Sequence, residues 1–184
     1  MEREQRLRLD EDFTAFVTTK GRQLVRLAEL LTGDPHRADD LVQSALERAY
    51  PRWHRIAKDD PTAYVRRIVV NQHRDWWRRL RNREVPTDAA PDRVDPVDQV
   101  DRYAQRALVL GALARLTVRE RTVVVLRYYE DLSEARIAAE LHIAPGTVKS
   151  TLSRALAKLR TFPELAGRLS PERAVPPVKS EVRS

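Results

Sequence analysis

The sequence of 184 residues is long enough for one ordinary domain or two small ones. Its 34 basic side chains outnumber its 27 acidic ones, and the resulting formal charge of +7 favours an anionic partner, either nucleic acid or an acidic membrane surface. Cysteine is absent, which excludes disulfides, thiolate metal sites and cysteine nucleophiles. Because no run of about 18 apolar residues occurs and the N-terminus is charged, we expect a cytoplasmic protein without membrane insertion.

The first half of the chain has the apolar spacing of successive helices. Apolar residues recur three and four positions apart almost throughout the sequence, which predicts an all-α protein. The first stripe covers 13–31 and is closed by Gly33, the residue type that most often follows a helix C-terminus. Asp34 before Pro35 is a typical helix start, and we expect this second helix to end before Tyr50.

A third helix and a linker complete this half. Asp60 before Pro61 repeats the start signal, and we expect the helix to reach about residue 83. Residues 84–102 hold three prolines and six acidic side chains against two arginines, a net charge of −4. Such a segment cannot bury enough apolar surface to offset the entropy of ordering, so we predict a flexible acidic linker.

A second helical block covers 103–161. The segment Thr117–Glu120 has the pattern of a capping box, and Ser133 is a good N-cap for a short helix. Pro145 starts the last helix of the block. The tail over 162–184 holds four prolines and no sustained periodicity, so we predict that it is disordered.

The last two predicted helices have the pattern of a helix-turn-helix. The first would bury Ile137, Ala138 and Leu141, and the second would bury a stripe that begins at Val148, with a three-residue turn between them. The second helix carries basic side chains and no acid. A recognition helix places its base-reading side chains in the half that enters the major groove, where Arg154 suits a bidentate contact to guanine. The alternative is an αα-hairpin with a solvated basic face.

An ordered set of short motifs runs through this block. It consists of Leu126–Ser133, Ile137-Ala138, Gly146–Ser150, Arg154–Leu156 and Leu159-Arg160. The set resembles region four of extracytoplasmic-function (ECF) sigma factors, the small group of the sigma-70 family of RNA polymerase specificity subunits. The resemblance implies that the helix pair reads the −35 promoter element and that the polymerase β flap is a partner. The DNA-binding residues it implies are Thr147, Lys149, Ser150, Ser153, Arg154 and Lys158.

Three residues depart from the region-four pattern, the first being Thr117, which stands where a proline is common. His142 replaces the usual glycine of the turn, which is tolerable because histidine is among the residues enriched at positive φ. Ala144 replaces a serine at the N-cap of the recognition helix, which weakens that cap by ~1 kcal/mol. None of the three departures removes a DNA-facing residue.

The third predicted helix carries a basic stripe. Its members, Arg67, Asn71, Arg74 and Arg78, recur at helical spacing, and residues 62–83 hold seven arginines against one aspartate. Arginines hold phosphates while an amide can hydrogen-bond a base edge, so the stripe suits a groove or a single strand. The alternative is a helix with its tryptophans in the core and its arginines solvated. For Trp76 itself we expect a place in the core. In the helix-turn-helix, we also consider Arg136 as a phosphate contact.

Two segments of the first half resemble region two of the same family. Residues 39–50 resemble the helix that docks on the β′ clamp helices, which implies polymerase-binding roles for Asp39, Asp40, Gln43 and Glu47. Without the resemblance, these four residues are the polar face of a helix. Ala63–Val65 followed by Ile68, Asn71, Asp75 and Arg78-Arg79 resembles the helix that melts and reads the −10 element. The resemblance implies −10 contacts by Arg67, Asn71, Arg74 and Arg78, and a loop over 54–61 that shapes the pocket for a flipped base.

No catalytic constellation stands out. His73-Arg74-Asp75 spells the kinase catalytic triplet, but Leu80 stands where that motif needs an asparagine, and the glycine-rich loop is missing. The four histidines have no neighbours at zinc-ligand spacing. We therefore expect neither an enzyme nor a bound cofactor or metal.

These observations combine into one expectation for fold and function. We expect an all-α protein of two small helical domains joined by a flexible linker, the second with a helix-turn-helix. The expected limits are 10–83 for a region-two-like domain, 84–102 for the linker, 103–161 for a region-four-like domain and 162–184 for the tail. The expected function is that of an alternative sigma factor that binds core RNA polymerase and promoter DNA, with an anti-sigma factor as a further partner to test. The alternative is a stand-alone helix-turn-helix transcriptional regulator.

Overall fold

The computed structural model of the chain describes residues 2–81 and 100–162. Every regular element assigned in these two ranges is a helix, which confirms the predicted all-α class. The predicted linker and tail lie outside the described residues except at their edges. At one edge the prediction is wrong, because residues 100–102 already belong to a helix.

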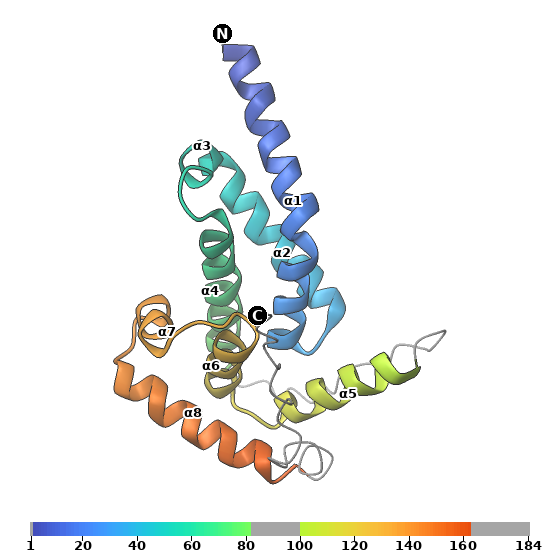
Figure 1. Cartoon of the computed structure of the whole chain (residues 1–184), viewed down its shortest axis with the longest axis vertical. Coiled ribbons are helices and arrows are strands. Elements are labelled where there is room, and N and C mark those ends of the chain that lie inside the picture. Colours follow the sequence, from blue (N-terminus) through green and yellow to red (C-terminus); the bar gives the residue numbers. More distant parts are fainter. Residues whose placement is uncertain (1, 82–99, 163–184) are drawn as a thin grey trace, which may run out of the picture.

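Four helices and a short 3-10 turn make up the N-terminal set. They are α1 (Glu2–Thr32), α2 (Pro35–Ala49), η1 (Tyr50–Arg52), α3 (Trp53–Ile56) and α4 (Pro61–Arg81). The long α1 packs along α2, and α4 packs against both (Figure 1). The expected loop over 54–61 begins as the short helix α3, because Trp53 and Ile56 are both buried in the core of this set.

Local signals fix the end of α1 and the starts of α2 and α4 as predicted. Gly33 follows α1 with a φ of 76°, a left-handed conformation that costs glycine little. The Asp34 carboxylate accepts a hydrogen bond from the Arg37 amide at 3.1 Å, which caps α2. Asp60 does the same for α4 by accepting from the Ala63 amide at 2.9 Å.

The C-terminal set contains α5 (Val100–Ala114), α6 (Val118–Tyr128), α7 (Glu134–Leu141) and α8 (Pro145–Arg160). The predicted capping box at the start of α6 is confirmed, since Thr117 and Glu120 bond reciprocally. Ser133 caps α7 as predicted. His142 adopts a left-handed φ of 54° between α7 and α8, and Ala144 provides no side-chain cap for α8.

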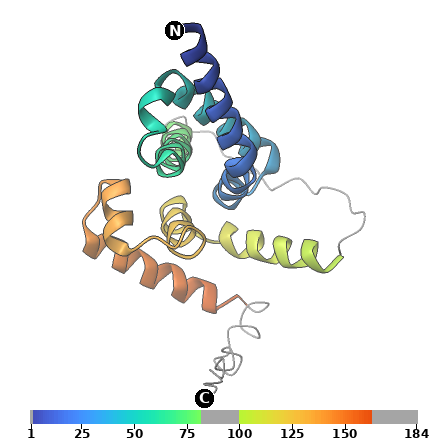
Figure 2. The same ribbon diagram turned by 45° about the horizontal axis from the view of Figure 1, so that its top comes forward.

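The two sets pack against each other. In both views the C-terminal set lies beneath the N-terminal set, and α6 lies beside α4 (Figures 1 and 2). Helix α6 contacts both α1 and α4, so the buried apolar side chains of the two sets form one continuous cluster. The helix-turn-helix of α7 and α8 is attached to this cluster through α6, which packs on both helices.

Candidate nucleic-acid interface

Helix α8 exposes most of the predicted −35 residues on one side. Its buried stripe consists of Val148, Thr151, Leu152 and Ala155, which pack toward α6 and α7. The opposite side exposes Lys149, Ser150, Ser153 and Arg154, while Thr147 is half-buried at the start of the helix. The structure therefore brings five of the six predicted residues to the N-terminal half or middle of one helix, with four of the five exposed to solvent.

Lys158 has a different environment. Its Nζ donates to Glu120 Oε2 at 2.8 Å, which ties the last turns of α8 to the first turn of α6. Glu120 is buried, and burial alone would raise its pKa, but hydrogen bonds from Lys158 and Thr117 lower the pKa overall. Lys158 therefore has a side-chain partner on α6, whereas Lys149 and Arg154 have no such partner within 2–81 and 100–162.

A hollow between α6 and α8 is lined in part by Arg119, a basic residue that the sequence pattern did not single out. Its lining includes Arg119 on α6 and Arg154 on α8, together with Thr151, whose buried hydroxyl has no hydrogen-bond partner among the described residues. Arg119 is exposed and follows the Thr117 cap by two positions. The capping-box pattern in the sequence already predicts that Arg119 lies in the first turn of α6. There the positive end of the helix dipole adds to the positive potential of the arginine.

The four residues of the basic stripe on α4 differ in their exposure to solvent and in the contacts that their side chains make. Arg67 is exposed, and Asn71 is half-buried beside it on the same face. Arg78 is exposed and pairs with Asp75 at 3.1 Å. Arg74 is half-buried, and its Nη1 donates to the Leu141 carbonyl of α7 at 3.3 Å, so it is bound to the C-terminal set.

Two further arginines have partners that the sequence pattern did not indicate. Arg66 belongs to the arginine-rich segment but is buried, and it bonds to glutamates of the C-terminal set rather than facing solvent. Arg136, considered as a phosphate contact, lies 3.5 Å from Asp60 and half of its side chain is exposed. Local sequence cannot show either outcome, because the partners are more than 60 residues away.

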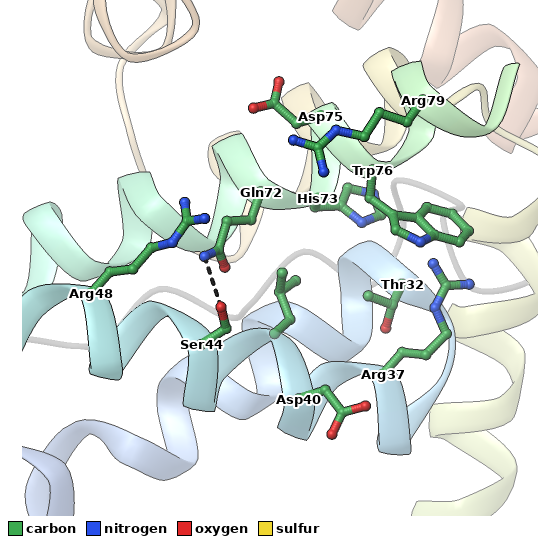
Figure 3. Close-up of a pocket in the computed structure, with 11 residues that line it drawn as sticks. Thr32, Arg37, Asp40, Ser44, Arg48, Gln72, His73, Asp75, Trp76 and Arg79 are labelled. Carbon is green, nitrogen blue, oxygen red and sulfur yellow. Dashed lines mark hydrogen bonds between the residues drawn. The ribbon is translucent and has the colours of Figure 1, made fainter. Parts of the chain in front are cut away.

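The expected core position of Trp76 is also wrong. Its side chain is 38 % exposed, and the Arg37 guanidinium lies over its ring at 3.7 Å from the centroid. Figure 3 shows this pair at one end of a cavity between α2 and α4, and a hydrogen bond between the side chains of Gln72 and Ser44 at the other. Arg48 and Arg79 also line the cavity.

His73 is the buried polar group of this cavity. Its side chain is 2 % exposed, and its Nε2 has no hydrogen-bond partner among the described residues. Burial, with the nearby charges of Arg121 and Arg37, lowers its pKa from 6.5 to about 3. His73 is therefore neutral at physiological pH, and the positive potential of the cavity comes from its arginines.

Three of the four predicted polymerase-binding residues share one groove on α2. Asp39, Gln43 and Glu47 line it together with apolar residues of α1 and α2, among them Phe13, Val17, Val25, Val42 and Leu46. Gln43 donates to Glu47 at 3.1 Å, and all four predicted residues are exposed. Asp40 differs from the other three, because it lines the cavity between α2 and α4 instead.

Metal-binding clusters and membrane-spanning helices were both sought among the described residues. Over 2–81 and 100–162, no group of three or more His, Asp or Glu side chains is arranged to hold a metal ion. Within the same ranges, no helix is long and apolar enough to cross a membrane.

Comparisons with known proteins identify both helix sets. Residues 16–83 match the family model of sigma-70 region 2, and residues 106–159 match that of sigma-70 region 4. The chain is 46 % identical over 151 residues to the RNA polymerase sigma-E factor of Streptomyces avermitilis, an alignment that covers 81 % of this chain and 83 % of the relative. It is 37 % identical to the ECF RNA polymerase sigma factor SigL of Mycobacterium tuberculosis, over 77 % of this chain and 84 % of the relative.

Solved structures agree with the fold. The sigma factor RpoE of Bartonella quintana, solved in complex with the anti-sigma factor NepR, superposes with a TM-score of 0.59 at 23 % identity, covering 84 % of this chain and 98 % of that one. CnrH, solved with the cytosolic domain of CnrY, gives a TM-score of 0.56 at 26 % identity, covering 86 % and 89 %. Together with the two matched regions and the sequence relatives, this likeness shows that the chain belongs to the ECF group of the sigma-70 family, whose members are alternative sigma factors that direct transcription initiation.

Proposed function

We propose that this chain binds core RNA polymerase and delivers it to promoters by reading −35 duplex with α8 and a melted −10 element with α4. One observation carries the proposal. Helix α8 buries one stripe against α6 and α7 and exposes Lys149, Ser150, Ser153 and Arg154 on the other side. A helix held in this way can enter the major groove with its polar side chains against the base edges.

The −35 contacts divide into base readers and phosphate holders. Arg154 is exposed in the middle of α8 and suits a bidentate contact to guanine O6 and N7. Arg119, across the hollow on α6, suits a phosphate of the same duplex, because it is exposed and lies at a helix N-terminus. Lys158 is the weakest member of the predicted set, since Glu120 already engages its ammonium group.

The −10 contacts are proposed for the exposed face of α4. Asn71 is an amide between arginines, and an extruded base offers its full edge to such a group. Arg67 and Arg78 are exposed on either side of it and suit the phosphates of a single strand. The arginines of the neighbouring cavity, Arg37, Arg48 and Arg79, increase the positive potential along this side of the helix.

The groove between α1 and α2 suits a helical partner. Its floor is apolar, and its rim carries Asp39, Gln43 and Glu47. An amphipathic helix with a basic rim would bury the apolar floor and complement the acids. We infer that the β′ clamp helices of polymerase occupy this groove and that the β flap contacts the C-terminal set.

The same family context supports the remaining partners and place of action. Solved relatives of this fold include a sigma factor bound to an anti-sigma factor, so an anti-sigma protein is a partner to test here. A protein that works with polymerase on the chromosome acts in the cytoplasm. The polymerase performs the chemistry, and this chain supplies promoter recognition and strand separation.

Reconstituted transcription tests the proposal. The purified chain is mixed with core polymerase, and run-off transcription is measured on promoters selected by genome-wide mapping of sites bound with polymerase. We expect transcription that depends on both promoter elements, and its loss in Asn71→Ala and Arg154→Ala. Tight binding to duplex DNA without any association with polymerase would instead favour a stand-alone helix-turn-helix regulator.

A further inference from the structure

The cavity between α2 and α4 has the dimensions of a small-molecule site. Its volume is about 370 Å³, inside the range of roughly 300–1,000 Å³ that is typical of ligand pockets. Thr32 at the end of α1 joins residues of α2 and α4 in the lining, so three helices hold the cavity in shape. The lining shares no residue with the groove between α1 and α2, and it excludes the four stripe residues of α4. Contacts with polymerase and with the −10 strand therefore leave this cavity without a role of its own.

One end of the cavity is cationic and aromatic. Arg37 is half-buried there, with its guanidinium 3.7 Å from the centroid of the Trp76 ring. Burial lowers the pKa of Arg37, and across the two described ranges no carboxylate forms an ion pair with it. Arg79, one turn after Trp76 on α4, adds an exposed second cation. A guanidinium stacked on a ring still directs N–H groups from its edge, so this end suits a phosphate.

His73 adds a buried polar atom at the same end. Its side chain is 2 % exposed, and its Nε2 has no hydrogen-bond partner among the residues that the structure describes. Figure 3 shows the ring beside Trp76 in the space between the two helices. A buried donor or acceptor without a partner costs free energy, which a ligand atom in the cavity would recover. Because the imidazole is neutral, Nε2 can donate to a phosphate oxygen or accept from a hydroxyl, according to its tautomer.

The other end of the cavity presents an amide and a guanidinium. The side chains of Gln72 and Ser44 are hydrogen-bonded at 3.1 Å, and the amide orientation that pairs both of its ends places its oxygen 3.2 Å from Arg48 Nε. Amides and guanidiniums are the groups that most often read the edge of a purine base. Arg37 and Arg48 are eleven residues apart on α2, roughly 16 Å along the helix axis, so a ligand that uses both ends is elongated.

Two carboxylates line the edges of the cavity. Asp75 pairs with Arg78 at 3.1 Å, and Asp40 is exposed. Figure 3 shows both carboxylates on the outer sides of the two helices, away from the space between them. The interior of the cavity therefore keeps the positive potential of its arginines, which favours an anionic ligand.

We propose that this cavity binds a purine nucleoside polyphosphate as a free small molecule. Its phosphates bind Arg37 and Arg79 beside Nε2 of His73, and the edge of its base meets Gln72 and Arg48. An inorganic anion would use one end only, and an apolar ligand would use neither. The site is a property of the chain without polymerase or DNA, so it does not depend on the proposed function.

Calorimetric titration of the full chain, without polymerase, tests the site. The ligands are ATP, GTP, ribose 5-phosphate and inorganic phosphate at one ionic strength, because salt screens exposed charges. We expect one molecule of ATP or GTP per chain, bound at least about tenfold more tightly than ribose 5-phosphate, which lacks the base and the additional phosphates. The indole N–H resonance of Trp76, assigned with Trp76→Phe among the three tryptophans, should shift on binding.

Variants assign the two ends of the ligand. Arg37→Met and Arg79→Met should each weaken the purine nucleotide by about tenfold, because each removes a charge-assisted hydrogen bond. Gln72→Ala should weaken ATP or GTP and leave ribose 5-phosphate unchanged. Arg52→Met removes an exposed arginine from the same helix set, outside the cavity, and should bind like the parent. Circular dichroism checks helix content, and if Arg37→Met loses helix, the exposed Arg79→Met carries the test.

Several results would overturn the site. They are the absence of ATP and GTP binding, an affinity for inorganic phosphate equal to that for the nucleotides, and an equal loss in Arg52→Met and Arg79→Met. A shift of the Trp76 resonance by a single-stranded oligonucleotide but by neither nucleotide would assign the cavity to the promoter strand instead. Loss of polymerase binding with nucleotide binding intact would overturn the proposed function and leave the site standing.

Discussion

Arg154 and Lys158 lie one turn apart on α8, yet their surroundings give them different roles. Arg154 is exposed beside the hollow that Arg119 also lines, whereas Lys158 is bonded to the buried Glu120. Spacing places both on the outer part of the helix, but only the fold brings Glu120 to within 2.8 Å of Lys158. We therefore expect substitutions of the two residues to have different effects.

We expect Arg154→Ala to lose specificity as well as affinity. Loss of a bidentate contact to guanine costs about 1–3 kcal/mol on a matched −35 duplex and little on a mismatched one. Equilibrium binding of the holoenzyme to both duplexes measures the difference. Arg160→Ala, which removes an exposed arginine at the end of the same helix, should weaken the two duplexes equally. An equal loss on both duplexes in Arg154→Ala would mean that this arginine only holds a phosphate.

His73 is a second residue whose role depends on its neighbours. The pKa in the folded chain is about 3 because the side chain is buried and faces Arg121 from α6 and Arg37 from α2. In the unfolded chain the pKa returns to its usual value near 6.5. Between these two values the unfolded state binds the extra proton, so stability rises with pH over this window and is lost as the pH falls.

We expect His73→Gln to flatten this dependence. The contribution of His73 to the pH slope of the unfolding free energy is up to about 1.4 kcal/mol per pH unit below its unfolded pKa. Urea titrations of parent and variant from about pH 4 to about pH 7 measure the slope, which linkage attributes to protons bound on unfolding. The exposed His54→Gln is the control and should keep the parent slope. Equal slopes in the parent and His73→Gln would show that His73 is not buried in its neutral form.

At the scale of single elements, α8 begins without a side-chain N-cap. Ala144 has the extended backbone of an N-cap, with φ −67° and ψ 143°, but offers no side-chain acceptor to the first turn. The preceding His142 also adopts a left-handed conformation, which is sterically unfavourable for a residue other than glycine. The recognition helix is held instead by Pro145 in its first turn and by its buried stripe.

We expect Ala144→Ser to stabilise the C-terminal set by about 1 kcal/mol, because a serine oxygen would accept one of the free amides of the first turn. Thermal unfolding followed by circular dichroism should show a higher Tm. Ala157→Ser, at an exposed position inside α8, introduces the same side chain without a cap and should lower the Tm slightly. No gain in Ala144→Ser would indicate that water already satisfies these amides.

At the scale of the whole molecule, the two sets form one packed unit over the described residues. Apolar contacts between α6 and the pair α1 and α4 are reinforced by the buried ion pairs of Arg66 with Glu130 and Glu140. Two small helical sets joined in this way should unfold together, because exposing the boundary of one also exposes charges of the other.

We expect urea unfolding to be a single transition in the parent and to split into two transitions, one for each helix set, in Arg66→Met. All three tryptophans lie in the N-terminal set, so their fluorescence follows that set alone, while circular dichroism follows both. The two signals should coincide in the parent and diverge in the variant. Arg52→Met should keep them coincident. Divergent signals in the parent would show that the sets unfold independently.

The sequence by itself determined all the long helices, several of their ends and the family. The stops and starts at Gly33, Asp34, Asp60, Thr117 and Ser133 depend on bonds within three or four residues, so they are visible in a short window of sequence. The motifs on α4 and α8 are equally local, and they indicate promoter recognition before any neighbour is known.

Only the tertiary structure decided which of these residues are free. It buried Arg66 against two glutamates, bonded Arg74 to α7, paired Lys158 with Glu120 and left Trp76 partly exposed beneath Arg37. The sequence pattern of a helix fixes which residues share a face. Whether that face meets water, a carboxylate or another helix depends on contacts between segments far apart in the chain, and helical periodicity carries no information about those contacts.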